Sequence, residues 1–239
     1  MGRGPSIEGR KNAEDAKRAK VFTKFIREIT LAVRSGGGDP ASNPRLRLAI
    51  DKALHANMTK DTIERAIKRG TGEGGAATEE IRYEGYGPGG VAILVDCMTD
   101  NPTRTVAEVR HAFTKHGGNL GTSGSVAFQF TETGEIIFDI RSQPELEEKI
   151  LELALDAGAD DVQTEDGFTD VLTTPANFEA VKNKLESAGL KAIEADVVMR
   201  PSNRVAMEGE AAETLKELLD WLEELDDVQD VHHNADLPA

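Results

Sequence analysis

Residues 17–36 read KRAKVFTKFIREITLAVRSG, and this stretch decides the fold of the first part of the chain. Apolar residues recur along it at steps of three and four: Phe22, Phe25, Ile26, Ile29 and Val33. That spacing places them on one face of an amphipathic helix. We therefore predict a helix from about Ala13 to Arg34, which the three glycines at 36–38 bring to an end.

Cations follow the same predicted helix on a different side. They recur at steps that keep them roughly aligned along the helix: Lys17, Lys20, Lys24, Arg27 and Arg34. Lys24 lies about 200° around the helix from Phe22, so this row of cations faces away from the apolar face.

Two more helices follow, and both carry local start signals. Asn43 is a good N-cap and Pro44 suits the first helical position. Thr59 can cap a third helix that runs through Arg69, with Gly70 as its stop. Each helix has one apolar face, and short helices of this kind bury such faces against each other. The sequence therefore predicts a small helical bundle with its cations outside.

Charge is divided unevenly along the chain. Residues 1–70 hold 16 Lys and Arg against 8 Asp and Glu, while residues 71–239 hold 12 against 35. A basic head on an acidic body indicates a polyanionic partner, because clustered cations release counterions from nucleic acid. The alternative is an ordinary solvated helix surface. The predicted nucleic-acid-binding residues are Lys17, Arg18, Lys20, Lys24, Arg27, Arg34, Arg45, Arg47, Lys52, Arg65, Lys68 and Arg69.

The polar side of the head lacks aromatic residues, since Phe22 and Phe25 belong to the apolar face. This disfavours a platform on which single-stranded bases stack. Residues 70–77 are rich in glycine and predict a flexible joint after the head.

Beyond the joint the hydrophobic period changes to that of strands. We predict a strand at 91–95, a helix from Asn101, and a second strand through Val126, Phe128 and Phe130. Residues 135–200 then predict the order β-α-β-β-α-β of a ferredoxin-like unit. A last helix at 210–225 and a strand at 228–233 follow.

One helix and one strand do not make a domain, so we pair these last elements with the unit at 81–130. The prediction is an α+β fold: an N-terminal three-helix bundle followed by two ferredoxin-like α/β sandwich domains, the third inserted in the second. The domain ranges are 1–75, 76–133 with 206–239, and 134–205. The alternative is a C-terminal helix that docks on the inserted domain.

A second group of cations lies in the acidic body. Arg104, Arg110 and Lys115 are possible secondary contacts for a nucleic acid, and four glycines follow between Gly117 and Ser125. Backbone N–H groups of a glycine-rich loop can hold a phosphate. A plain turn at a helix end is the favoured interpretation, because the segment has no Lys-Ser/Thr phosphate-loop pattern.

No arrangement of residues predicts catalysis, a metal or a cofactor. His111 and His116 diverge on a helix, and His232 and His233 would point to opposite faces of a strand. The one cysteine, Cys97, lies in an apolar run, which favours a buried thiol and a reducing, cytoplasmic compartment. No apolar run is long enough to predict a membrane span.

Several short motifs of the sequence closely resemble those of the YebC/PmpR family. They are FTK at 22–24, IREIT at 26–30, GGGDP at 36–40, NPRLR at 43–47, IERAI at 63–67, YEGYGPGG at 83–90 and RTVAEVR at 104–110. The resemblance runs from about Asp15 to the C-terminus. Residues 5–11 depart from it, because a tryptophan and a run of cations are usual there in the family.

The resemblance implies three domains, with the third inserted in the second. It also implies one of two activities: DNA-binding transcriptional regulation, or action on the ribosome as in the similar mitochondrial translation activators, which help it past proline-rich stretches. We expect a non-enzymatic, DNA-binding transcriptional regulator. The alternative is a ribosome-associated factor that binds ribosomal RNA. The sequence leaves the oligomeric state open.

Overall fold

The structure is a computed structural model that describes the backbone of residues 7–72 and 78–238 and the side chains from residue 20 onward. Two compact units are present. The first comprises the described parts of residues 1–81, 96–108 and 221–230, and the second the described parts of 82–95, 109–220 and 231–239. The flexible joint predicted at 70–77 lies mostly outside the described residues.

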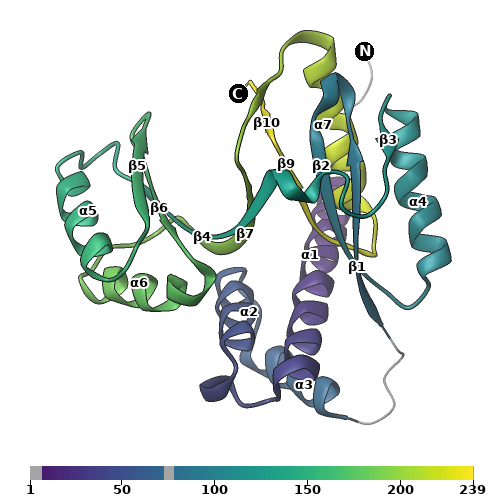
Figure 1. Cartoon of the computed structure of the whole chain (residues 1–239). Coiled ribbons are helices and arrows are strands. Elements are labelled where there is room, and N and C mark those ends of the chain that lie inside the picture. Colours follow the sequence, from purple (N-terminus) through teal and green to yellow (C-terminus); the bar gives the residue numbers. More distant parts are fainter. Residues whose placement is uncertain (1–6, 73–77, 239) are drawn as a thin grey trace. The chain divides into compact units, whose positions relative to one another are not determined.

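Three helices open the first unit, as Figure 1 shows: α1 (Ile7–Gly36), α2 (Pro44–His55) and α3 (Lys60–Thr71). The predicted caps are confirmed. The side chain of Asn43 accepts a hydrogen bond from the N–H of Leu46, and that of Thr59 accepts one from the N–H of Thr62. A short 3-10 turn at Pro40–Ser42 joins α1 to α2.

The three helices bury their apolar faces together. Ile29, Leu46 and Ala53 are fully buried, and Ile63 and Ala66 nearly so. The predicted residues Phe22, Phe25 and Ile26 are partly buried and pack on this core. The three-helix bundle is therefore confirmed.

Two helix ends differ from the prediction. The first helix starts at Ile7, six residues earlier than expected. The third continues through Gly70 to Thr71, so Gly70 is not its stop. The reason is packing: a Cβ added at Gly70 would lie 2.7 Å from the Cβ of Val33 on α1. Gly70 therefore lets two helices approach closely rather than ending one.

One four-stranded sheet has the order β3-β1-β2-β9. Its strands are β1 (Glu79–Tyr86), β2 (Ala92–Thr99), β3 (Asn119–Leu120) and β9 (Val228–His233). The helix α4 (Pro102–Lys115) connects β2 to β3, and α7 (Gly209–Glu224) precedes β9. The spatial order of the strands is that of a ferredoxin-like sheet. The order along the chain differs, because β1, the strand between β2 and β3, comes before both of them.

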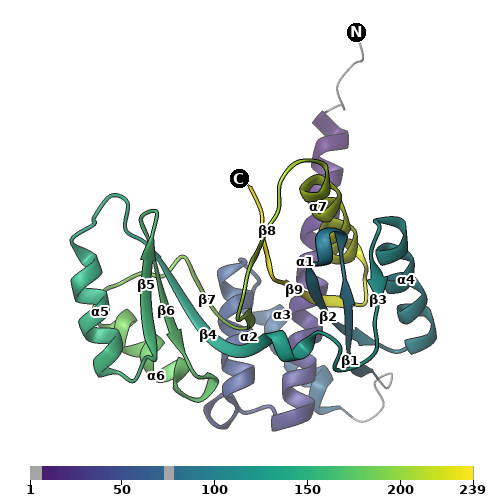
Figure 2. The same cartoon turned by 45° about the horizontal axis from the view of Figure 1, so that its top comes forward.

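The second sheet has the order β5-β6-β4-β7 and the full β-α-β-β-α-β succession (Figure 2). Its elements are β4 (Phe130–Asp139), α5 (Leu146–Asp156), β5 (Asp161–Glu165), β6 (Phe168–Thr173), α6 (Pro175–Ser187) and β7 (Glu194–Pro201). All three strand pairs are antiparallel. Both helices contact this sheet and each other.

The strand predicted through Val126, Phe128 and Phe130 is wrong. Residues Ala127–Gln129 form a 3-10 turn, and the strand that begins at Phe130 belongs to the second sheet, where it pairs with Pro201. Val126 and Phe130 are buried because they pack on Ala92 and Leu94. Phe128 between them is 76% exposed, so the alternation of apolar residues at 126–130 does not mark one buried face of a strand.

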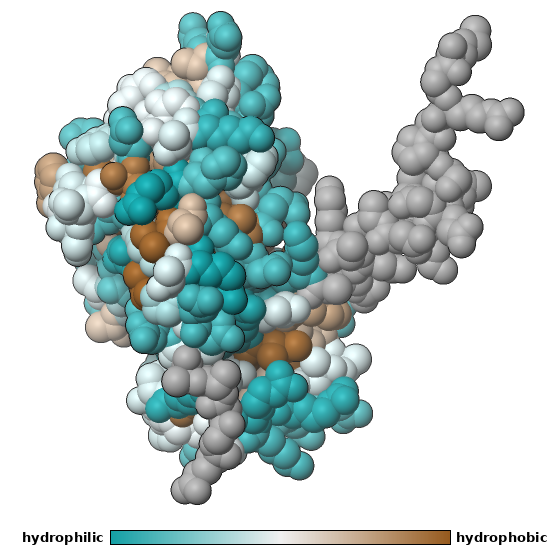
Figure 3. Space-filling model, turned by 90° about the vertical axis from the view of Figure 1, so that its right-hand side faces the viewer, coloured by the Kyte–Doolittle hydropathy of each residue, from teal (hydrophilic) through white to brown (hydrophobic). Residues whose placement is uncertain are grey.

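The α+β class, the helical bundle and the two sheet domains are confirmed. The predicted boundary between residues 133 and 134 falls inside β4, and the three domain ranges stay a prediction. A short parallel pair, β8 (Val205–Ala206) with β10 (Ala235–Asp236), completes the described strands. None of the described helices has the length and apolar character that a membrane span needs. The face in Figure 3 is mostly hydrophilic, with small apolar areas.

Candidate nucleic-acid interface

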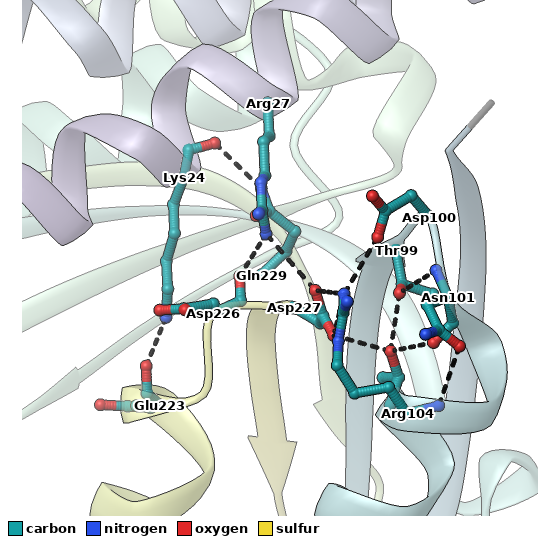
Figure 4. Close-up of polar contacts among 11 residues, drawn as sticks. Lys24, Arg27, Thr99, Asp100, Asn101, Arg104, Glu223, Asp226, Asp227 and Gln229 are labelled. Atoms are coloured by element: carbon teal, nitrogen blue, oxygen red, sulfur yellow. Dashed lines mark hydrogen bonds and ion pairs between the residues drawn. The ribbon is translucent and has the colours of Figure 1, made fainter. Parts of the chain in front are cut away.

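Lys20, Lys24 and Arg27 of α1, which we call the α1 stripe, contact the C-terminal end of α7 and the residues just after it. Figure 4 shows Lys24 and Arg27 beside Glu223 and Asp226. The Nζ atom of Lys20 lies 3.1 Å from Oε2 of Glu224 and 3.2 Å from its carbonyl oxygen. Lys24 donates to the carbonyl oxygen of Glu223 over 2.5 Å. Arg27 donates to the carbonyl oxygen of Asp226. The last carbonyls of a helix lack partners within the helix, and cations are favoured there.

A further hydrogen bond joins α1 to β9, next to the α1 stripe. The side-chain amide of Gln229 donates to the carbonyl oxygen of Lys24 over 2.9 Å. Burial lowers the pKa of Lys24, although the carboxylates of Glu223, Asp230 and Glu224 act in the opposite direction. The α1 stripe is therefore engaged by acceptors of its own chain.

Asp227 is the buried anion of this region. Its side chain is only 4% exposed and accepts hydrogen bonds from Arg104 over 3.0 to 3.2 Å and from the hydroxyl of Thr105 over 2.8 Å. Arg27 approaches the same carboxylate at 4.0 Å. The backbone carbonyl oxygen of Asp227 accepts a hydrogen bond from the N–H of Met98. Asp227 thus joins α1, α4 and the end of β2.

Arg104 was predicted as a secondary contact, and the structure pairs it with two carboxylates, those of Asp100 and Asp227. These hydrogen bonds raise the pKa of its guanidinium, with Asp227 the larger cause. Arg110 and Lys115 are exposed on α4. The three predicted cations therefore differ in their surroundings, because Arg104 is bound by two carboxylates of its own chain, whereas Arg110 and Lys115 are exposed.

On α2 the predicted cations are also engaged. Arg45 makes ion pairs with Glu28 at 2.9 Å and Glu80 at 2.7 Å. Burial alone would lower its pKa, but the hydrogen bonds to these carboxylates outweigh burial and raise it. Arg47 donates to the carbonyl oxygens of Pro40 and Ala41. Lys52 is half-buried.

Four of the predicted cations are exposed and make no ion pair with any residue that the structure describes: Arg34, Arg65, Lys68 and Arg69. We call these four residues the basic end. Arg34 donates to the hydroxyl of Thr78 over 3.0 Å, and Arg65 to the carbonyl oxygen of Asp61 over 3.3 Å.

The four cations come from two helices whose C-terminal ends adjoin. Gly70 of α3 adjoins Val33 of α1, and a Cβ at Gly38 would lie 3.0 Å from the side chain of Thr71. On α3, Lys68 and Arg69 follow Arg65 by three and four residues, the spacing of side chains that are neighbours on a helix surface. The side chains of Lys17 and Arg18 lie outside the described residues.

The glycine-rich loop is held by an internal anion. The carboxylate of Glu84, on β1, accepts the N–H of Gly124 at 2.6 Å, of Val126 at 3.0 Å and of Ala127 at 2.7 Å. Burial alone would raise the pKa of Glu84, but these three donors outweigh burial and lower it. Glu84 takes the N–H of Gly124, and the N–H groups of Gly118, Gly121 and Ser125 donate to backbone carbonyl oxygens, so the structure supports the turn interpretation.

Neither Glu84 nor Asp227 was predicted from the sequence. The only signal for Asp227 is the acidic run EELDD at 223–227, and nothing near Glu84 marks it as a clamp. Both act on segments far along the chain, which a local pattern does not show.

Two further titratable residues, Cys97 and His116, are buried. Cys97 is buried, and burial raises the pKa of its thiol to about 12, with Asp96 and Asp227 acting in the same direction. The Nδ1 atom of His116 lies 2.7 Å from the carbonyl oxygen of Ala112. In the part of the chain that the structure describes, no three His, Cys, Asp or Glu side chains are grouped as metal ligands.

Two family models match this chain. The model described as TACO1/YebC protein N-terminal domain matches residues 4–73, and that described as TACO1/YebC second and third domain matches residues 78–235. The chain belongs to the TACO1/YebC family. The resemblance noted in the sequence is thereby confirmed.

Relatives within the TACO1/YebC family share most of the sequence. A probable transcriptional regulatory protein of Xanthomonas oryzae is 58% identical over 242 residues, covering 100% of this chain and 99% of its own length. One from Stenotrophomonas maltophilia is 60% identical, with coverage of 100% and 98%. The crystal structure of a conserved hypothetical protein from Aquifex aeolicus aligns with a TM-score of 0.83 at 46% identity, covering 94% and 93% of the two chains.

Proposed function

We propose that this chain is a non-enzymatic regulator that binds DNA through the basic end of its helical bundle. The observation that carries the proposal is the exposure of Arg34, Arg65, Lys68 and Arg69, four cations without a carboxylate partner among the described residues. A chain of net charge −15 that nevertheless presents such a group concentrates its attraction for polyanions in one place.

The physical argument is counterion release. Each phosphate that a Lys or Arg neutralises frees a condensed cation from the nucleic acid. Residues 71–239, with 12 cations against 35 anions, repel a polyanion, so the contact is confined to the head. The regulatory part of the proposal draws on the relatives, which are named probable transcriptional regulatory proteins.

Phosphate contacts position a nucleic acid without reading its sequence. Ribosomal RNA presents the same phosphates, so the basic end is compatible with both polymers. The experiment must therefore identify the polymer as well as the surface.

The test is a pull-down of the full chain from lysate at physiological salt, followed by sequencing of the bound nucleic acid. The basic-end variant is R65E/K68E/R69E, and the matched control is K149E/K184E/K191E, which changes the net charge equally on exposed cations of α5, α6 and the loop after it. We expect promoter fragments with the wild type and the control, and their loss with the basic-end variant.

Two results would contradict the proposal. Equal recovery with both variants would remove the basic end as the binding surface. Enrichment of ribosomal RNA at defined helices, without promoter DNA, would replace the transcriptional role with a role on the ribosome.

A further inference from the structure

The acidic run EELDD at residues 223–227 lies along the α1 stripe, as Figure 4 shows for Lys24 and Arg27. Every cation of the stripe contacts this run. Lys20 pairs with Glu224, Lys24 donates to the carbonyl oxygen of Glu223, and Arg27 donates to that of Asp226. The three cations are spaced by about one helical turn. The run therefore sets a row of oxygen acceptors along α1.

These acceptors use the N–H donors that a phosphate would need. Lys and Arg bind carboxylate, carbonyl and phosphate oxygens with the same N–H donors. A donor that already serves the run has to exchange that acceptor before it serves a phosphate.

The contacts of the acidic run with its surroundings differ in strength between its exposed residues and its buried residue Asp227. The Lys20 and Glu224 side chains are 47% and 60% exposed, and exposed ion pairs of this kind contribute little stability. Asp227, by contrast, is buried and held by Arg104 and Thr105. The outer acceptors can therefore exchange while Asp227 keeps its place.

We propose that residues 223–226 form an autoinhibitory anion, which occupies the α1 stripe until a nucleic acid displaces it. The stripe is then a second phosphate-binding surface, additional to the basic end. This inference rests on the proposed function, because it concerns the same class of ligand.

The first test neutralises the covering run and leaves Asp227 intact. The unmasked variant is E223Q/E224Q/D226N, three exposed residues, and its matched control is E147Q/E148Q/E152Q, three exposed residues of α5. The probe is a labelled DNA duplex of mixed sequence, followed by fluorescence anisotropy with the full chain. A labelled ribosomal RNA fragment is titrated in parallel.

We expect the unmasked variant to bind about threefold more tightly than the control, because three nearby charges no longer compete within a Debye length. Its affinity should also fall more steeply with salt, since more phosphates are engaged. Equal affinities of the two variants would overturn the inference, because the gain would then follow net charge alone. Thermal unfolding checks that both variants are folded.

The second test combines the stripe with its cover. K20Q/K24Q is introduced into the wild type and into the unmasked variant. The affinity loss should be about threefold larger in the unmasked background, because there the carboxylates of the run no longer compete with phosphates for the two lysines. An equal loss in both backgrounds would contradict masking.

The two proposals fail differently. If the wild type binds and the basic-end variant does not, while the unmasked variant gains nothing over its control, only the autoinhibition fails. If neither the wild type nor the unmasked variant binds DNA or RNA, both proposals fail.

Discussion

At the scale of single residues, two buried carboxylates do more for the fold than the exposed charges around them. Glu84 and Asp227 are 4% and 3% exposed as residues, and each accepts three or more hydrogen bonds. A buried acceptor of several donors leaves all of them unsatisfied when it is removed, which is costly. A single substitution of either residue should therefore lower the free energy of unfolding measurably.

The substitution Glu84→Gln should loosen the loop at 124–127. A neutral amide accepts these N–H groups more weakly, so we expect a loss of about 2 kcal/mol. Hydrogen exchange at Gly124, Val126 and Ala127 should become faster by a factor of ten or more, about what that loss predicts. The exposed neighbour Glu79→Gln serves as the control, and equal exchange in both variants would show that the carboxylate does not clamp the loop.

The contribution of Glu84 should also depend on pH. Its folded-state pKa is lowered, so the stabilisation is complete above the unfolded-state pKa of about 4.3 and is lost as the pH falls through the folded value. The stability difference between wild type and Glu84→Gln, measured by urea unfolding, should therefore be constant near neutral pH and shrink below pH about 4. A difference that grew on acidification would reverse the sign we assign.

Asp227→Asn tests the second carboxylate. We expect it to lower the free energy of unfolding by about 2 kcal/mol or more, because Arg104 and Thr105 lose a charged acceptor. Asp100→Asn removes the exposed partner of the same arginine and should stay close to the wild type. Thermal or urea unfolding compares the two, and a larger effect at Asp100 would contradict the arrangement.

At the scale of elements, local signals predicted helices well and strands less well. Caps such as Asn43 and Thr59 act within three residues, so the sequence displays them directly. The strand β3 has only two residues, and its pairing with Gly85 and Tyr86 bridges more than thirty positions. No local pattern marks such a strand. The apolar residues at 126 and 130 were therefore assigned to a strand of the first sheet, whereas Val126 lies in a loop and Phe130 begins β4 of the second sheet.

The caps differ in how much they hold. Asn43 is buried, and its side chain also donates to the carbonyl oxygens of Ala32 and Gly37, so it ties α1 to α2. Asn43→Ala should cost clearly more than Thr59→Ala, which removes an exposed cap worth about 1 kcal/mol. Unfolding of both variants measures the gap, and similar losses would mean that the two further hydrogen bonds contribute nothing.

At the scale of the whole molecule, the sequence shows that positive and negative charges are segregated. It shows only in part which of the cations stay available for a ligand. Twelve cations of the head were predicted to face a nucleic acid. The structure engages Lys20, Lys24 and Arg27 with residues two hundred positions away, and it engages Arg45 with Glu28 and Glu80. Periodicity shows which side of a helix is polar, but it does not show which polar partner arrives there. Among the side chains that the structure describes, the basic end is the group of predicted cations that has no ion pair.

The most direct test of the central claim is the salt dependence of DNA binding by the full chain. Anisotropy titrations of a labelled duplex would compare wild type, the basic-end variant and K149E/K184E/K191E across a series of salt concentrations. If each of the four cations of the basic end engages one phosphate, log K of the wild type should fall with log salt at a slope of about −4. The basic-end variant should bind far more weakly with a slope shallower by about 3, whereas the control should keep the wild-type slope. Equal slopes for the basic-end variant and the control would contradict the account.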